Sequence, residues 1–112
     1  MAVAAAVVQV TSDGDRYQWR LLTAGSGRPV AVCGDYSHAS ITACRACATA
    51  SIRLAHAARI RVRMVLPGRY GWLLVYGEMV LARSVHSYPD LTAARQDGQD
   101  ARRDLRTAVL TT

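Results

Sequence analysis

The stretch Arg16–Ser37, RYQWRLLTAGSGRPVAVCGDYS, decides the fold, because a shorter version of it returns at Arg69–Ser87 as RYGWLLVYGEMVLARSVHS. The Arg-Tyr-x-Trp starts of the two stretches lie 53 positions apart, and their final serines lie 50 apart. A shortening of the turn at Ala24–Arg28 accounts for the difference, and the spacing of 50 then pairs Val30 with Val80. A repeated supersecondary unit is the first feature that a fold prediction should use. We therefore predict two versions of one unit, each followed by an Ala-rich helix.

Aromatic and apolar side chains occupy every second position in both copies, which is typical of strands with one buried face. The buried set is Tyr17, Trp19 and Leu21 in the first copy and Tyr70, Trp72 and Leu74 in the second. The predicted strands cover residues 3–11, 16–23, 29–33, 59–66, 69–76 and 79–84, with a short final strand within 107–112.

Two helices complete the predicted units. The first begins between Ser37 and Ser40, both good N-caps, and the second runs from about Pro89 to about Arg106. Gly98 in the second helix predicts close packing there, since a mid-helix glycine costs about 1 kcal/mol relative to alanine. The sequence thus predicts one α+β domain, residues 1–112, in which two tandem βββα units (about 1–58 and 59–112) share one antiparallel sheet with both helices on one face.

The composition favours a globular chain and permits an anionic partner, although solubility is the simpler explanation of the positive charge. Apolar residues make up 51% of the sequence, and all 14 basic residues are arginine, which gives a net charge of +6. Three cysteines, an odd number, give no paired disulfide framework and suit a reducing compartment. The apolar start lacks a basic region and is too short for a signal peptide, and no run reaches membrane-spanning length. We therefore expect a cytoplasmic protein with no membrane contact and no cofactor.

One family shares these motifs. The run Asp13–Leu21, then Ser26-Gly27-Arg28-x-Val30, then Tyr36-Ser37, resembles the small YegP-like domain family, whose repeats carry an aromatic-x-aromatic-x-Leu strand, a tight turn and Tyr-x-Ser before an Ala-rich helix. In the second copy His86 stands where tyrosine is usual. The resemblance implies tandem three-strand-plus-helix units on a shared sheet. It implies no established catalytic residues, because the family is largely uncharacterised.

Arginines on the strands form the best candidate binding surface. If the aromatic residues face the helices, six arginines project from the opposite side of the sheet: Arg16, Arg20, Arg59, Arg61, Arg63 and Arg69. Such a face would attract phosphates, and guanidinium groups stack on bases. The simpler alternative is that the Arg stems cover an otherwise open sheet and deter aggregation.

Four residues raise the question of a metal: Cys33, His38, Cys44 and Cys47 form C-x4-H-x5-C-x2-C. They could supply four zinc ligands, but the spacing matches no common zinc module. On an Ala-rich helix, Cys44 and Cys47 are more simply explained as small hydrophobic residues. The sequence therefore predicts no metal.

Catalysis has one weak candidate, the matched loops Tyr36-Ser37-His38 and His86-Ser87-Tyr88, which could present a polar pocket. Helix capping by the serines is the simpler explanation. We therefore expect a non-enzymatic YegP-like binding or interaction module whose partner the sequence does not name. A nucleic-acid binder using the Arg-lined face is the first alternative, and a small enzyme using the Tyr/Ser/His loops is the second. A homodimer through a sheet edge is a further candidate interaction.

Overall fold

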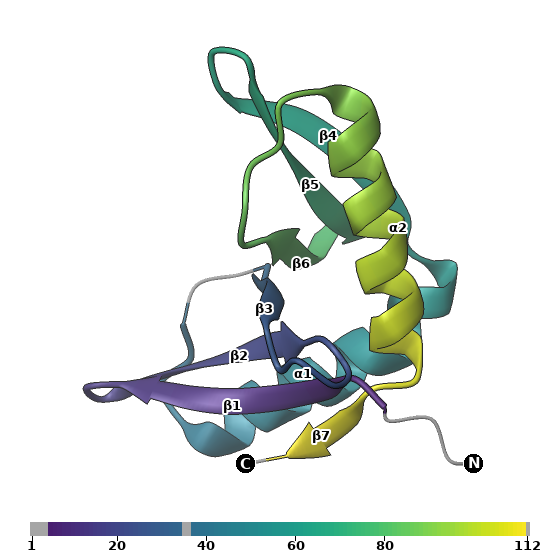
Figure 1. Ribbon diagram of the computed structural model, residues 1–112. Coiled ribbons are helices and arrows are strands. Elements are labelled where there is room, and N and C mark those ends of the chain that lie inside the picture. The colour runs from purple at the N-terminus through teal and green to yellow at the C-terminus, as the bar shows by residue number, and fades with distance from the viewer. Residues whose placement is uncertain (1–4, 35–36, 112) are drawn as a thin grey trace.

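The computed structural model describes residues 5–34 and 37–111 and has a mixed α+β fold. In the described part of the chain one seven-stranded sheet is combined with two helices (Figure 1). The elements are β1 (Val7–Asp13), β2 (Arg16–Leu22), β3 (Pro29–Cys33), α1 (Ile41–Leu54), the short 3-10 turn η1 (Ala55–Ala57), β4 (Arg59–Leu66), β5 (Arg69–Tyr76), β6 (Met79–Ser84), α2 (Leu91–Arg106) and β7 (Val109–Thr111).

The strand order is β4-β5-β6-β3-β2-β1-β7, so the two halves of the chain meet where β3 pairs with β6. Six strands pair antiparallel, but β7 runs parallel to β1 and adds a seventh strand at the edge. The expectation of a wholly antiparallel sheet is therefore wrong at this edge. β7 follows directly after α2 and lies along the outer edge of β1 (Figure 1).

Both helices pack on the face of the sheet to which the two tryptophans point. Trp19 donates its indole N–H to Cys47 of α1, and Trp72 donates to Asp97 of α2. Leu21 pairs with Ala31 and Leu74 pairs with Ala82, and the pairing of β3 with β6 places these four buried residues on the same face. The tryptophans are the largest fully buried side chains and anchor the core.

Gly98 lets α2 approach the sheet closely, as predicted. A Cβ at this position would lie 2.9 Å from Trp72 Cγ and 3.0 Å from Ile60 Cγ2, closer than packed carbon atoms allow. The glycine lowers the helix propensity of α2 but allows the helix to contact the indole of Trp72.

Three details differ from the sequence expectations. β1 covers Val7–Asp13 rather than 3–11, because the two-residue turn at Gly14-Asp15 lets pairing continue to the tip; residues 3 and 4 lie outside the described residues. Pro89 precedes the N-cap of α2, which is Asp90. The pairing of Val30 with Val80 is off by one, because Ala31 and Ala82 hold the matching places opposite Leu21 and Leu74, a spacing of 51.

Neither described helix is long and apolar enough to cross a membrane.

Candidate functional site

The sheet face opposite the helices carries a row of alternating arginine and apolar residues, hereafter the Arg row. Register pairs connect its members across five strands, from β4 to β2, in the order Arg61, Leu73, Arg83, Val32 and Arg20. Gln9 of β1 continues the row, since its side-chain oxygen accepts from Arg20 Nε and Nη2 at 3.2 and 3.0 Å. Because the pairs are direct neighbours in the sheet, these side chains lie on one face.

The β4 arginines lie on this face as predicted from alternation. Ile60 of β4 lies next to Gly98 of α2, so its neighbours Arg59 and Arg61 point to the other side, and Arg63 follows them. All three are exposed, and β4 is an edge strand.

Arg16 and Arg69 are held differently, because each binds the loop that follows the third strand of its half. Arg16 Nε donates to Ser37 Oγ at 3.0 Å and its Nη2 donates to the Ser37 carbonyl oxygen. Arg69 repeats both bonds with Ser87, at 3.0 and 2.7 Å. Backbone pairs fix the same loops, Tyr17 with His38 and Tyr70 with Tyr88. These two arginines therefore have a structural task in addition to any role on the face.

Sequence reasoning missed Arg83. Its place in the row depends on the pairing of β3 with β6, which no local pattern reveals. Arg83 Nε donates to the Cys33 carbonyl oxygen at 3.3 Å, and the side chain lines two shallow pockets. The pocket of about 240 Å³ also contains Arg63 and His86, and the pocket of about 320 Å³ contains Arg16 and Gln18.

Charge is unevenly distributed between the two sides of the molecule. In the described part of the chain none of the seven strand arginines (Arg16, Arg20, Arg59, Arg61, Arg63, Arg69 and Arg83) forms an ion pair with a carboxylate. The ion pairs that do form join Arg103 to Asp100 and Asp104 on α2. The sheet face therefore keeps its positive charge, which favours an anionic ligand.

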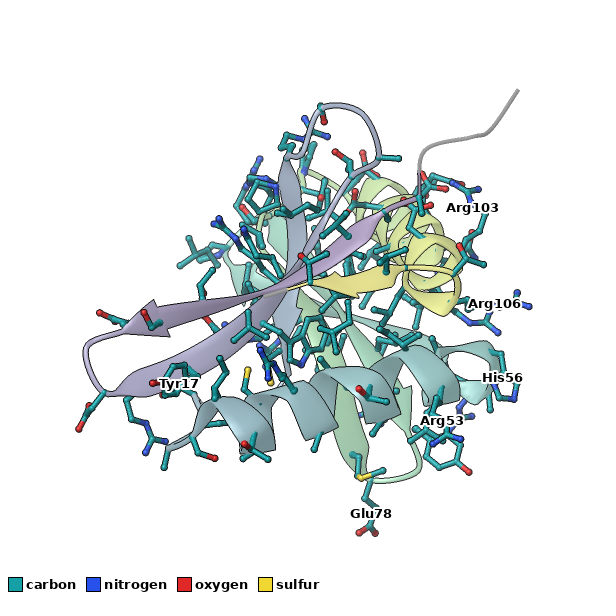
Figure 2. The ribbon with its side chains drawn as sticks, turned by 90° about the horizontal axis from the view of Figure 1, so that it is seen from below. Tyr17, Arg53, His56, Glu78, Arg103 and Arg106 are labelled. Atoms are coloured by element: carbon teal, nitrogen blue, oxygen red, sulfur yellow. The ribbon has the colours of Figure 1, made fainter. Side chains whose placement is uncertain are left out.

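Arg102 of α2 binds the backbone of η1. It donates from Nε to the Ala55 carbonyl oxygen at 3.0 Å and from Nη2 to the His56 carbonyl oxygen at 2.7 Å, so it ties α2 to the end of η1. Figure 2 shows Arg103 and Arg106 pointing outward from α2 instead.

Three of the four possible metal ligands come together between α1 and the sheet. Cys33 Sγ lies 3.6 Å from His38 Nε2 and 3.6 Å from Cys47 Sγ, and all three ligand atoms lie within 4.8 Å of one another. Cys33 ends β3, His38 pairs with Tyr17 beside the start of α1, and Cys47 lies in α1. Cys44 is buried and does not join the group.

The surroundings of the two helix cysteines shift their pKa values in opposite directions. The pKa of Cys47 is lowered to about 5, first by hydrogen bonding with Cys33 and then by Trp19 and His38, against the effect of burial. Burial raises the pKa of Cys44, and the charge on Cys47 adds to this.

The described residues of the Tyr/Ser/His loops line two different pockets. His86 and Ser87 line the smaller pocket, whereas Ser37 lines the larger one. Tyr88 interacts with Asp97, and burial followed by this bond raises its pKa. Tyr36 lies outside the described residues.

The fold is the one found in YegP-like proteins. A solution structure of the Escherichia coli protein of unknown function yegP matches with a TM-score of 0.78 at 11% identity, covering 99% of this chain and 95% of that one. A UPF0339 protein from Shewanella oneidensis matches with a TM-score of 0.75, also at 11% identity, covering 96% and 90%. At this identity the likeness concerns the fold alone. No protein-family model matches the sequence, and no curated protein matches it.

Proposed function

We propose that this chain is a non-enzymatic binding module and that single-stranded nucleic acid binds across its Arg row. The observation that carries the proposal is the register that aligns Arg61, Arg83 and Arg20 on one face. With strands about 4.8 Å apart, successive arginines of the row stand about 10 Å apart. Three cationic positions therefore span roughly 20 Å, a length suited to an extended polyanion.

The chemistry between the arginines favours a nucleic acid over a plain polyanion. Leu73 and Val32 separate the three arginines, so apolar surface alternates with positive charge. Phosphates would pair with guanidinium groups, and bases would lie on the apolar positions or stack on the guanidinium planes. The two pockets that Arg83 lines lie beside the row, one on each side of the β3–β6 pair, and could accept parts of the nucleic acid.

Direct binding tests the proposal. Fluorescence anisotropy of labelled, random-sequence DNA and RNA single strands should rise with protein concentration at low salt. A preparation that has not been treated with nuclease should carry extra absorbance from nucleic acid. If neither signal is seen at low salt, the arginines only cover the open sheet face and do not bind nucleic acid.

We also propose that the chain consists of two versions of one βββα unit, residues 1–58 and 59–112. Support comes from matched contacts: Arg16 with Ser37 repeats as Arg69 with Ser87, and the indole bond of Trp19 to α1 repeats from Trp72 to α2. β4 and β7 are the two edges at which a second copy could extend the sheet, and β4 is the longer of them.

The small-enzyme alternative has weaker support than the binding module. Its serines each accept a hydrogen bond from an arginine Nε, which does not activate a hydroxyl for attack. A ligand bound jointly by both loops would favour the enzyme.

A further inference from the structure

We propose that Cys33, His38 and Cys47 form a zinc site of two thiolates and one imidazole, open at the fourth position. This reverses the sequence expectation that the cysteines only fill the core. The geometry behind it is independent of the Arg row, so either proposal can fail alone.

Two of the three distances between the ligand atoms fit a tetrahedral ion, and the third, between His38 Nε2 and Cys47 Sγ, is within 4.8 Å. With Zn–S at about 2.3 Å and Zn–N at about 2.0 Å, tetrahedral ligand atoms lie roughly 3.8 Å (S to S) and roughly 3.6 Å (S to N) apart. The two sulfur atoms here are 3.6 Å apart, and Cys33 Sγ is 3.6 Å from His38 Nε2. The three ligand atoms come from three separate segments of the chain, which fixes their relative positions.

The surroundings supply support for the ligands. Trp19 Nε1 donates to Cys47 Sγ at 3.4 Å, the kind of outer contact that orients and stabilises a metal-bound thiolate. Two backbone hydrogen bonds with Tyr17, at 2.8 and 2.6 Å, hold His38 in place. Cys33 is fully buried, whereas His38 and Cys47 are half-buried, so an ion can reach the group from the surface.

The second half of the chain provides a natural comparison. There, Trp72 donates to Asp97 at 2.7 Å, and Tyr88 also bonds Asp97. Register places Ser84 where the first half has Cys33.

Asp97 and Tyr88 thus occupy two of these places in the second half, and the Ser84 hydroxyl accepts a hydrogen bond from the backbone N–H of Trp72 at 3.1 Å. The first half has Cys47, His38 and Cys33 there instead, and all three are good zinc ligands. Because the indole of Trp72 meets a carboxylate, the matching place beside Trp19 also suits a negatively charged thiolate.

Three protein ligands leave one tetrahedral position for water or another donor, as in zinc sites of the open kind. Two thiolates and a neutral imidazole balance the charge of one divalent zinc ion. Cys44, although it lies on the same helix as Cys47, takes no part, and the second half has Ala94 at its place.

The test uses the full chain, reduced and treated with chelator, titrated with Co²⁺ alone as a spectroscopic probe of the zinc site. We expect one equivalent to produce thiolate-to-cobalt charge-transfer absorption, which Zn²⁺ then abolishes. Cys47→Ser and His38→Gln should each weaken Co²⁺ binding at least about tenfold, whereas Cys44→Ala should leave it unchanged.

Circular dichroism should show that each variant is folded. If Cys47→Ser fails to fold, His38→Gln still tests the proposal, because His38 pairs with Tyr17 through backbone atoms that this substitution does not change. Absence of the absorption band would overturn the proposal, and so would a band that persists in both variants. If the reduced protein does not bind Co²⁺ but forms a Cys33–Cys47 disulfide in air, the two cysteines are a redox pair and the metal site is refuted.

Discussion

Arg20 and Arg83 are both register partners of Val32, so the two cationic side chains flank one valine on the same sheet face although they lie 63 positions apart in the chain. This relationship exists only because β3 pairs with β6. It brings the arginines of the first half and those of the second onto one continuous sheet face, which we propose as the binding surface.

Arg69 and Arg63 should differ in what they contribute. Replacing Arg69 by Gln removes two hydrogen bonds to Ser87, so we expect the free energy of unfolding to fall by about 1–3 kcal/mol. Arg63→Gln, at an exposed position, should change it by less than about 0.5 kcal/mol. Urea denaturation measures both. Equal costs would mean that the bond to Ser87 does not hold the loop.

Gly98→Ala should destabilise the protein although alanine is the better helix former. The new methyl group would push against Trp72 and Ile60, and overpacking of this kind costs about 1–3 kcal/mol. Gln99→Ala, one position further along the same helix and exposed, is the matched control and should be neutral or slightly stabilising. Thermal unfolding of the parent protein and both variants measures these changes in stability. A more stable Gly98→Ala variant would show that α2 can move away from the sheet.

Cys47 should be alkylated by iodoacetamide at lower pH than Cys44 in the metal-free, reduced protein. Its lowered pKa, about 5, keeps it a thiolate at neutral pH, and the reaction should slow as the pH falls through that value. Cys44, buried and with a raised pKa, should react only at high pH or on unfolding. Peptide mass mapping across a pH series identifies the modified residue. Preferential labelling of Cys44 would contradict the lowered pKa of Cys47.

Residues 1–58 expressed alone should self-associate or remain unfolded. The fragment would expose the edge of β3 that β6 covers, and it would lose β7, which comes from the end of the chain. Light scattering and chemical denaturation of the fragment, compared with the full chain, provide the check. A monomeric fragment that unfolds cooperatively would show that the halves fold independently.

Local patterns predicted most of the fold, because alternation and capping act over a few residues. The burial of Trp19 and Trp72, the cap at Ser40 and the close packing at Gly98 all follow from neighbours in sequence. The features that escaped prediction depend on pairing between distant segments. The short final strand was predicted, but its parallel direction was not, and neither was the pairing of β3 with β6 as the place where the two halves meet.

The candidate sites show the same division. Alternation alone placed Arg59, Arg61 and Arg63 on one side of β4, whereas Arg83 joined them only through the sheet. The pairing of His38 with Tyr17 is equally non-local, and it brings the imidazole to two thiols that the spacing alone did not connect.

A salt series tests the central claim, that the Arg row binds single-stranded nucleic acid, most directly. With about four phosphate contacts, made by the three arginines of the row and the neighbouring Arg63 of β4, the logarithm of the affinity should fall with the logarithm of salt concentration at a slope near −3, since each contact contributes about −0.7. Arg61→Gln with Arg63→Gln should reduce the slope by roughly one to two units. The matched double variant of Arg103 and Arg106, on the exposed end of α2, should keep the parent slope. Equal losses in the two double variants, or no binding by the parent protein at low salt, would contradict the claim.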